Sequence, residues 1–86
     1  MFGNKGAENG KLMYPTGICI DSNNVVYITE LGNNRISVFT INGKFLTSFG
    51  TKGNEEGQFV DPRGIAMDKD GFVYVSDQKN DRIQVF

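Results

Sequence analysis

The chain has 86 residues, which is enough for one small domain and too few for two. Its 9 basic and 10 acidic side chains leave a formal net charge of -1, so no overall positive field attracts nucleic acid. Cys19 is the only cysteine and histidine is absent, which excludes an intrachain disulfide, histidine-based catalysis and the common zinc sites. An unpaired cysteine favours a reducing compartment and no apolar run could span a membrane, so we expect a cytoplasmic protein.

Four strands are expected in the first half of the chain. They comprise residues 16–21, 25–29, 35–40 and 44–49. The first contains an apolar run at residues 17–21, which predicts a strand buried on both faces. The other three are rich in β-branched and aromatic residues or alternate strictly between apolar and polar. Asn23-Asn24 and Asn42-Gly43 lie between strands and are typical of two-residue hairpin turns.

Three more strands are expected in the second half. They comprise residues 63–68, 72–76 and 82–86. A long loop rich in glycine and charge, residues 50–62, precedes them, and Asp70-Gly71 is typical of a hairpin turn. No segment has sustained helical spacing, so the chain is expected to be all-β.

The second half of the sequence repeats the first. Shifting the chain by 47 residues places residues 2–39 on residues 49–86 without a gap, and seventeen of these 38 pairs are identical. Residues 40–48, which carry the fourth strand, occur once. We therefore divide the chain into a first unit at residues 1–49 and a second unit at residues 50–86 that lacks its last strand.

A four-stranded antiparallel meander that repeats every forty to fifty residues or so is typical of a β-propeller blade. One meander has two apolar faces and cannot bury either alone, whereas blades stacked around an axis cover one another. The expected fold is therefore two four-stranded antiparallel meander blades of a β-propeller, the second lacking its fourth strand.

The repeated unit resembles the NHL repeat of β-propellers. The resembling segments are residues 57–68, 71–77 and 80–86, the last of which begins with Asn80 and contains Arg82-Ile83. The family's histidine corresponds to Asn34 and Asp81, and Glu30 stands where the family more often has aspartate. The resemblance implies a six-bladed ring. We expect a piece of a longer chain; the alternative is three copies that close a ring through heterologous contacts.

Residues that recur in both units are expected to be architectural, because a property that every blade needs is more often structural than catalytic. The recurring residues are Gly17, Asp21, Asn33, Arg35, Gly64, Asp68, Asn80 and Arg82. We expect both arginines to bond to the nearby acids Glu30 and Asp77. We expect Asp21 and Asp68 to cap the hairpin turns that follow them.

Ligand contacts are expected where the two units differ, on loops that reach the surface of a ring. The first strand of each blade runs from one face to the other, so the loop before it and the loop between the second and third strands emerge together. The candidate residues on this face are Tyr14, Thr16, Leu31, Asp61, Arg63, Gln78 and Lys79. Tyr14 offers an aromatic surface and Arg63 and Lys79 offer cationic donors, while neighbouring acids oppose a phosphate backbone.

The first functional hypothesis is a non-catalytic interaction module that needs no cofactor and binds a protein partner on this face. The resemblance implies this role, because NHL propellers of tripartite-motif ubiquitin ligases recruit targets while a RING domain elsewhere does the chemistry. Single-stranded RNA binding on the same face, in post-transcriptional regulation, is the main alternative. A further alternative is the scaffold of a propeller lyase, although this chain has none of the histidines that would hold its metal.

Overall fold

The first of two antiparallel sheets in the computed structural model, which describes residues 3, 5, 6 and 8–86, is a four-stranded meander. Its strands are β1 (Pro15–Ile20), β2 (Val25–Glu30), β3 (Arg35–Thr40) and β4 (Phe45–Phe49). Each strand pairs with the next one along the chain, because the short connections allow only antiparallel neighbours.

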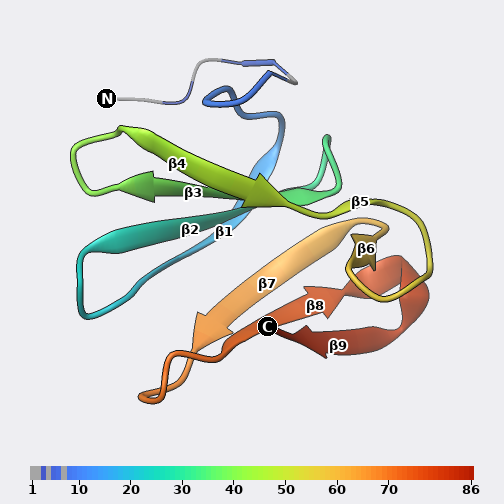
Figure 1. Cartoon of the computed structure of the whole chain (residues 1–86). Coiled ribbons are helices and arrows are strands. Elements are labelled where there is room, and N and C mark those ends of the chain that lie inside the picture. The colour runs from blue at the N-terminus through green and yellow to red at the C-terminus, as the bar shows by residue number, and fades with distance from the viewer. Residues whose placement is uncertain (1–2, 4, 7) are drawn as a thin grey trace.

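The second sheet is a three-stranded antiparallel meander. Its strands are β7 (Pro62–Met67), β8 (Val73–Asp77) and β9 (Arg82–Val85), and a 3₁₀ helix, η1 (Gln78–Asn80), joins β8 to β9. In Figure 1 the two sheets form separate layers, and β7 lies beside the first sheet. The expected all-β fold of antiparallel meanders is confirmed, and the strand ends fall within one residue of their expected positions. No helix in the described part of the chain is long and apolar enough to cross a membrane.

The segment between the sheets is more regular than the irregular loop that the sequence predicted. β5 (Thr51–Lys52) pairs in parallel with β6 (Gln58–Phe59), and a parallel bridge joins Lys5 to Leu12 at the corresponding place before the first sheet. For β5 and β6 to pair in parallel, the chain between them must return to the starting end of β5 before β6 begins. Gly57 lies in this returning segment at a φ of 78°, which glycine adopts without strain. We call residues 8–14 the first connector and residues 50–61 the second connector.

The main hydrophobic core lies between the two sheets. Its buried members are Ile36, Phe59, Val73 and Val75, and the side chains that pack against them are Tyr27, Phe49, Ile65 and Met67. A second cluster covers the other face of the first sheet, where Leu12 packs with Val26, Ile28 and Phe39. Leu12 and Phe59 are equivalent positions of the two units, so each connector places one apolar side chain into a core.

The expectation that the first strand is buried on both faces is wrong. Ile18 and Ile20 of β1 are 62% and 51% exposed. They pair with Ile28 and Val26, so they lie on the face of the first sheet that points away from the second sheet. Because β1 packs on β7 through its other face alone, the apolar run marks a strand that is covered on one side.

Candidate functional site

Four segments meet at one end of the molecule, which we call the loop end (Figure 1). They are the two connectors, the β2–β3 loop (residues 31–34) and the β8–β9 segment (residues 78–81). The N–H of Leu31 donates to the carbonyl of Tyr14 over 2.9 Å, and the N–H of Lys79 donates to the carbonyl of Val60 over 3.1 Å. The first bond joins the first connector to the β2–β3 loop, and the second joins the second connector to the β8–β9 segment.

Glu30, the last residue of β2, organises the first half of the loop end. Its fully buried carboxylate accepts hydrogen bonds from Nε of Arg35 at 2.7 Å, Nδ2 of Asn33 at 2.8 Å, the N–H of Met13 at 3.1 Å and the hydroxyl of Ser37. The Arg35 guanidinium also donates to two backbone carbonyls of the first connector. The ion pair therefore fixes the connector to the sheet through charge-assisted bonds.

Asp77, the last residue of β8, does the same for the second connector. Its fully buried carboxylate accepts from Nε of Arg82 and Nδ2 of Asn80, both at 2.9 Å, from the N–H of Val60 at 2.8 Å and from Nε2 of Gln84 at 3.2 Å. Arg82 donates to three backbone carbonyls of the second connector. Burial alone would raise the pKa of Asp77, but the bonds from Asn80, Val60 and Arg82 outweigh it and lower the pKa below its ordinary value.

Three hydrogen bonds join the sheets to each other at the loop end, and one of them runs from the Thr16 hydroxyl to the carbonyl of Pro62. The side-chain oxygen of Asn34 accepts from the N–H of Asp61 over 3.0 Å, and the hydroxyl of Thr29 donates to the carbonyl of Arg63, also over 3.0 Å. Gly17 makes this approach possible, because a Cβ at that position would lie 2.6 Å from the Arg63 carbonyl oxygen. The loop end is thus a single, cross-linked platform built from both units.

Sequence reasoning missed several of the side chains that build this platform. They are Thr29, Asn34, Ser37 and Gln84. A hydroxyl recurs at the position of Thr29 as Ser76, and this repetition was a usable signal. Ser37 and Gln84 are also equivalent positions, but their different chemistry concealed their shared role of donating to a buried acid.

Tyr14 presents its side chain to solvent at the edge of the platform. The residue is 65% exposed and has a φ of 49°, a left-handed conformation that is uncommon for a bulky residue. Gly32 makes room for the Met13 side chain and for the ring, because a Cβ there would clash with Cγ of Met13 and lie 2.9 Å from the ring carbon Cδ2 of Tyr14. Beside it is a shallow pocket of about 310 Å³, whose lining includes Leu12 and Pro15. An exposed ring held beside an apolar pocket on a constrained backbone is suited to ligand contact.

The other candidate residues differ in how far a partner could reach them. Arg63, Gln78 and Lys79 are exposed, whereas Leu31 and Asp61 are half-buried. Thr16 is exposed, but its hydroxyl donates to the carbonyl of Pro62 over 3.0 Å and so helps to join the sheets. Tyr14, Arg63, Gln78 and Lys79 are therefore the accessible side chains of this set.

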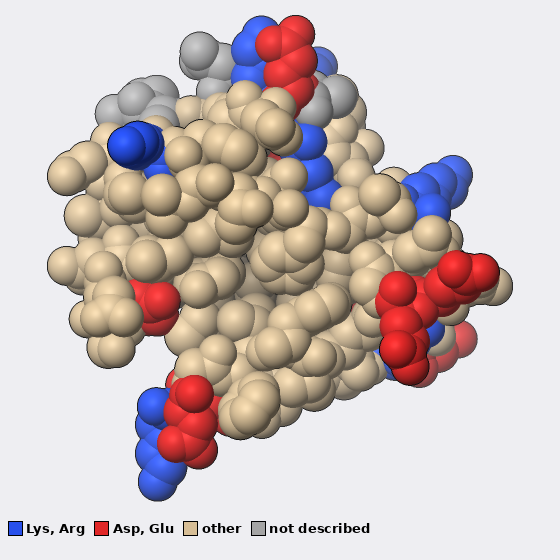
Figure 2. Space-filling view, in the orientation of Figure 1, with Lys and Arg blue, Asp and Glu red and all other residues tan. Residues whose placement is uncertain are grey.

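The loop end is not a uniformly positive surface. The second connector carries the exposed acids Glu55 and Glu56, and Asp81 in the β8–β9 segment is also exposed. Figure 2 shows charged side chains of both signs around the edge of the face in view, with an uncharged surface across its centre. Mixed charge of this kind gives little attraction for a polyanion.

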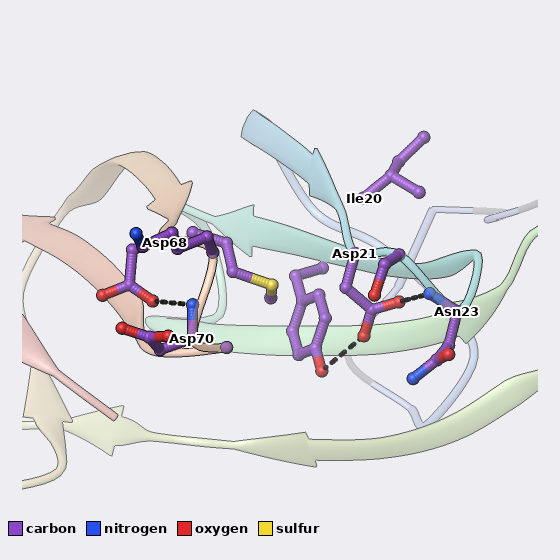
Figure 3. A pocket seen from close by; sticks show the side chains of 10 residues that line it. Ile20, Asp21, Asn23, Asp68 and Asp70 are labelled. Carbon is purple, nitrogen blue, oxygen red and sulfur yellow. Dashed lines mark hydrogen bonds between the residues drawn. The ribbon is translucent and has the colours of Figure 1, made fainter.

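The opposite end, which we call the hairpin end, has a cleft of about 410 Å³ between the β1–β2 and β7–β8 turns. Asp21 and Asp68 line it from the two turns, and Figure 3 shows the Asp68 carboxylate turned toward the N–H of Asp70 in its own turn. Each carboxylate accepts two backbone N–H bonds from its own turn, at 2.8 to 3.0 Å. These acids are engaged in turn formation, and among the described residues no cluster of acids or cysteines is placed to hold a metal ion.

Comparison with known proteins identifies relatives that share the repeat. The NHL repeat family matches the chain twice, over residues 12–39 and 59–86, which is more than half of it. The RING finger protein nhl-1 of Caenorhabditis elegans is 43% identical over 49 residues, or 57% of this chain. Protein lin-41 of the same organism is 41% identical over 46 residues (54%), and the E3 ubiquitin-protein ligase TRIM71 of Xenopus tropicalis is 38% identical over 44 residues (51%). The match spans only 4 to 5% of the length of these relatives.

Proposed function

Because this chain belongs to the NHL repeat family, we propose that it is a non-catalytic interaction module that binds a protein partner through its loop end. The observation that carries the proposal is the exposed Tyr14 ring on a rigid platform. The buried acids Glu30 and Asp77 fix both connectors before any ligand arrives, so little conformational entropy is lost when a partner docks.

The chemistry of the loop end favours a protein over single-stranded RNA. Tyrosine and arginine are the residues that most often dominate protein interfaces, and Tyr14 and Arg63 are both exposed here. A strand of RNA would bring one negative charge per nucleotide toward Glu55, Glu56 and Asp81. A peptide with an apolar anchor beside an acidic residue suits the Tyr14 ring, its neighbouring pocket and the Arg63 guanidinium.

The names of two relatives suggest a setting for this module. One is called a RING finger protein and another an E3 ubiquitin-protein ligase. In our proposal the chain is the target-recruiting part of such a ligase, and the chemistry belongs to another domain. The setting is cytoplasmic, where an unpaired thiol such as Cys19 stays reduced.

The proposal is tested by selecting binders from a phage-displayed library of random twelve-residue peptides and titrating the best peptide against variants of the chain. Tyr14→Asn removes the ring while keeping a residue that tolerates the left-handed conformation. We expect this change and Arg63→Glu each to weaken binding by about tenfold or more. Lys44→Glu, an exposed change at the hairpin end, is the matched control and should leave the affinity unchanged.

The results that would contradict the proposal differ from those that would favour RNA binding. Equal loss of affinity in the Lys44→Glu control, or none in the two loop-end variants, would place the peptide elsewhere and contradict the proposal. A parallel titration with fluorescent poly(U) addresses RNA. Tighter binding of poly(U) than of any selected peptide, with a steep dependence on salt that Arg63→Glu reduces, would favour the RNA alternative instead.

A further inference from the structure

The chain contains one blade-to-blade interface, and the two surfaces that form it recur unpaired elsewhere on the same chain. The tyrosine face of the first sheet comprises Tyr27, Thr29, Ile36 and Val38, and its equivalent on the second sheet comprises Tyr74, Ser76, Ile83 and Val85. The aliphatic face of the second sheet comprises Ile65, Met67, Val73 and Val75, and its equivalent on the first sheet comprises Ile18, Ile20, Val26 and Ile28.

Inside the chain, the tyrosine face of the first sheet packs on the aliphatic face of the second. Tyr27 and Ile36 share one apolar cluster with Val73 and Val75. Polar contacts fix the register: Thr29 donates to the carbonyl of Arg63, and Asn34 accepts from the N–H of Asp61. The interface is therefore heterologous, with two different surfaces in contact.

The two remaining faces carry exposed apolar side chains, although Val26 and Ile28 on the aliphatic face of the first sheet are buried beside Leu12. On the tyrosine face of the second sheet, Ile83 is 61% and Val85 is 53% exposed. On the aliphatic face of the first sheet, Ile18 and Ile20 are exposed by similar fractions. Contiguous exposed apolar side chains of this kind mark an interaction surface.

Two polar contacts of the internal interface have counterparts on the open faces, whereas the bond from the Thr16 hydroxyl to the Pro62 carbonyl has none, because Arg63 is the equivalent of Thr16. Gly64 repeats the small residue at Gly17, Ser76 repeats the hydroxyl of Thr29, and Asp81 repeats the side-chain oxygen of Asn34. Opposite them, the carbonyl of Thr16 and the N–H of Tyr14 correspond to the groups of Arg63 and Asp61 that are bonded in the internal interface.

The backbone at these counterparts already has the docking conformation. Asn34 and Asp81 have φ of 50° and 53°, and Asp61 and Tyr14 have φ of 55° and 49°. A bond from the N–H of Tyr14 to the carboxylate of Asp81 therefore needs no rearrangement of either loop. The open faces therefore match each other in apolar character and in these two polar contacts.

We infer that a second copy of this chain docks head to tail, with the aliphatic face of its first sheet on the tyrosine face of the second sheet, repeating the internal interface. The contact leaves one open face at each end of the pair, so further copies add until a ring closes. The inference rests on the sheet faces; it shares Tyr14 with the proposed partner site, through the backbone N–H and not through the exposed ring.

The test uses one charged substitution on each open face. Ile18→Glu blocks the aliphatic face and Ile83→Glu blocks the tyrosine face, and both sites are exposed in the single chain, so the fold tolerates the charge. By sedimentation velocity, the natural chain should form oligomers, each variant alone should be a monomer, and an equimolar mixture of the two should form a 1:1 dimer through the two intact faces. Ile41→Glu, an exposed isoleucine in the β3–β4 turn, is the matched control and should still form oligomers.

Three results would overturn the inference. The first is that the unmodified chain stays monomeric at a concentration about 100 times the detection limit of the sedimentation experiment. The second is that one variant alone forms a dimer, and the third is that the mixture of the two variants stays monomeric. The second result would indicate a symmetric contact between identical faces. Far-UV circular dichroism checks that each variant is folded, and Ile20→Lys with Val85→Lys provides a second pair for the same mixing experiment if either first variant unfolds.

Discussion

Glu30 and Asp77 fill equivalent positions with side chains of different length, and the residue that donates to each acid compensates. The longer Glu30 bonds to the short Ser37, whereas the shorter Asp77 bonds to the long Gln84. Each pair spans a similar distance between β2 and β3 or between β8 and β9. The longer acid of the first unit is therefore accommodated by a shorter donor on the neighbouring strand.

We expect the two changes to be coupled in a double-mutant cycle. Glu30→Asp alone retracts the carboxylate from its buried donors and should cost about 2 kcal/mol of unfolding free energy. Adding Ser37→Gln recreates the pair seen in the second unit and should recover about half of that loss, whereas Ser37→Gln alone should destabilise by overpacking. Urea denaturation of the four proteins measures the cycle, and strictly additive losses would refute the compensation.

The buried acid Asp77 also predicts how stability changes with pH. Its pKa is lower in the folded chain than the ordinary value of 3.8, so its ionised form contributes stability that is fully present above that value and is lost as the pH falls below it. Asp77→Asn should destabilise the chain by about 2 kcal/mol at pH 7, and the difference from the natural chain should shrink below about pH 4. Asp70→Asn, at an exposed turn, is the control for general effects of charge removal. A difference that stays constant from pH 7 to pH 3 would contradict the assignment.

Among the elements, β1 and β7 determine how closely the two sheets approach. Gly17 of β1 faces the carbonyl of Arg63 and the hydroxyl of Thr29, so the strands meet through backbone at this point. Gly64 is the equivalent residue of β7, but in this chain a Cβ there would meet only the Ser76 side chain, with its hydroxyl oxygen at 3.1 Å. The same glycine is thus at a packed site in one unit and at an open site in the other.

Gly17→Ala and Gly64→Ala form a matched pair that tests this difference. The added methyl at Gly17 would lie 2.6 Å from the Arg63 oxygen and must push the sheets apart, so we expect a loss of about 2 kcal/mol. The same change at Gly64 should cost less than about 0.5 kcal/mol in the monomer, because a serine side chain can rotate away. Thermal unfolding at low concentration compares them, and equal losses would show that the sheets are not held in close contact at Gly17.

For the molecule as a whole, the sequence predicted the strands of the two repeated units. It missed the features that depend on how distant segments pack together. The hairpin signals and the duplication were sufficient for both meanders, because each strand pairs with its neighbour along the chain. The exposure of Ile18, the bond from Asp61 to Asn34 and the parallel pairing of β5 with β6 depend on how distant segments meet. Local patterns carry no information about how distant segments meet. The recurrence of a hydroxyl at Thr29 and Ser76 was the one usable signal, and it concerned a different contact, the bond from Thr29 to the carbonyl of Arg63.

The sequence predicted which residues gather at the loop end. It did not predict the backbone conformation or the hydrogen bonds of each one. Chain direction alone places the connectors and the β2–β3 and β8–β9 loops at one end. The left-handed backbone of Tyr14 and the use of the Thr16 hydroxyl between the sheets required the three-dimensional arrangement.

The proposal that the loop end docks a protein is tested most directly by NMR with the selected peptide and the uniformly ¹⁵N-labelled Ile83→Glu variant, which keeps the chain monomeric if the sheet faces associate. We expect the largest amide shift changes at Tyr14, Leu31, Arg63 and Lys79, with Asp21 and Asp68 at the hairpin end unaffected. Changes that cluster at the two hairpin turns, or that leave Tyr14 and Arg63 unmoved at saturation, would contradict it.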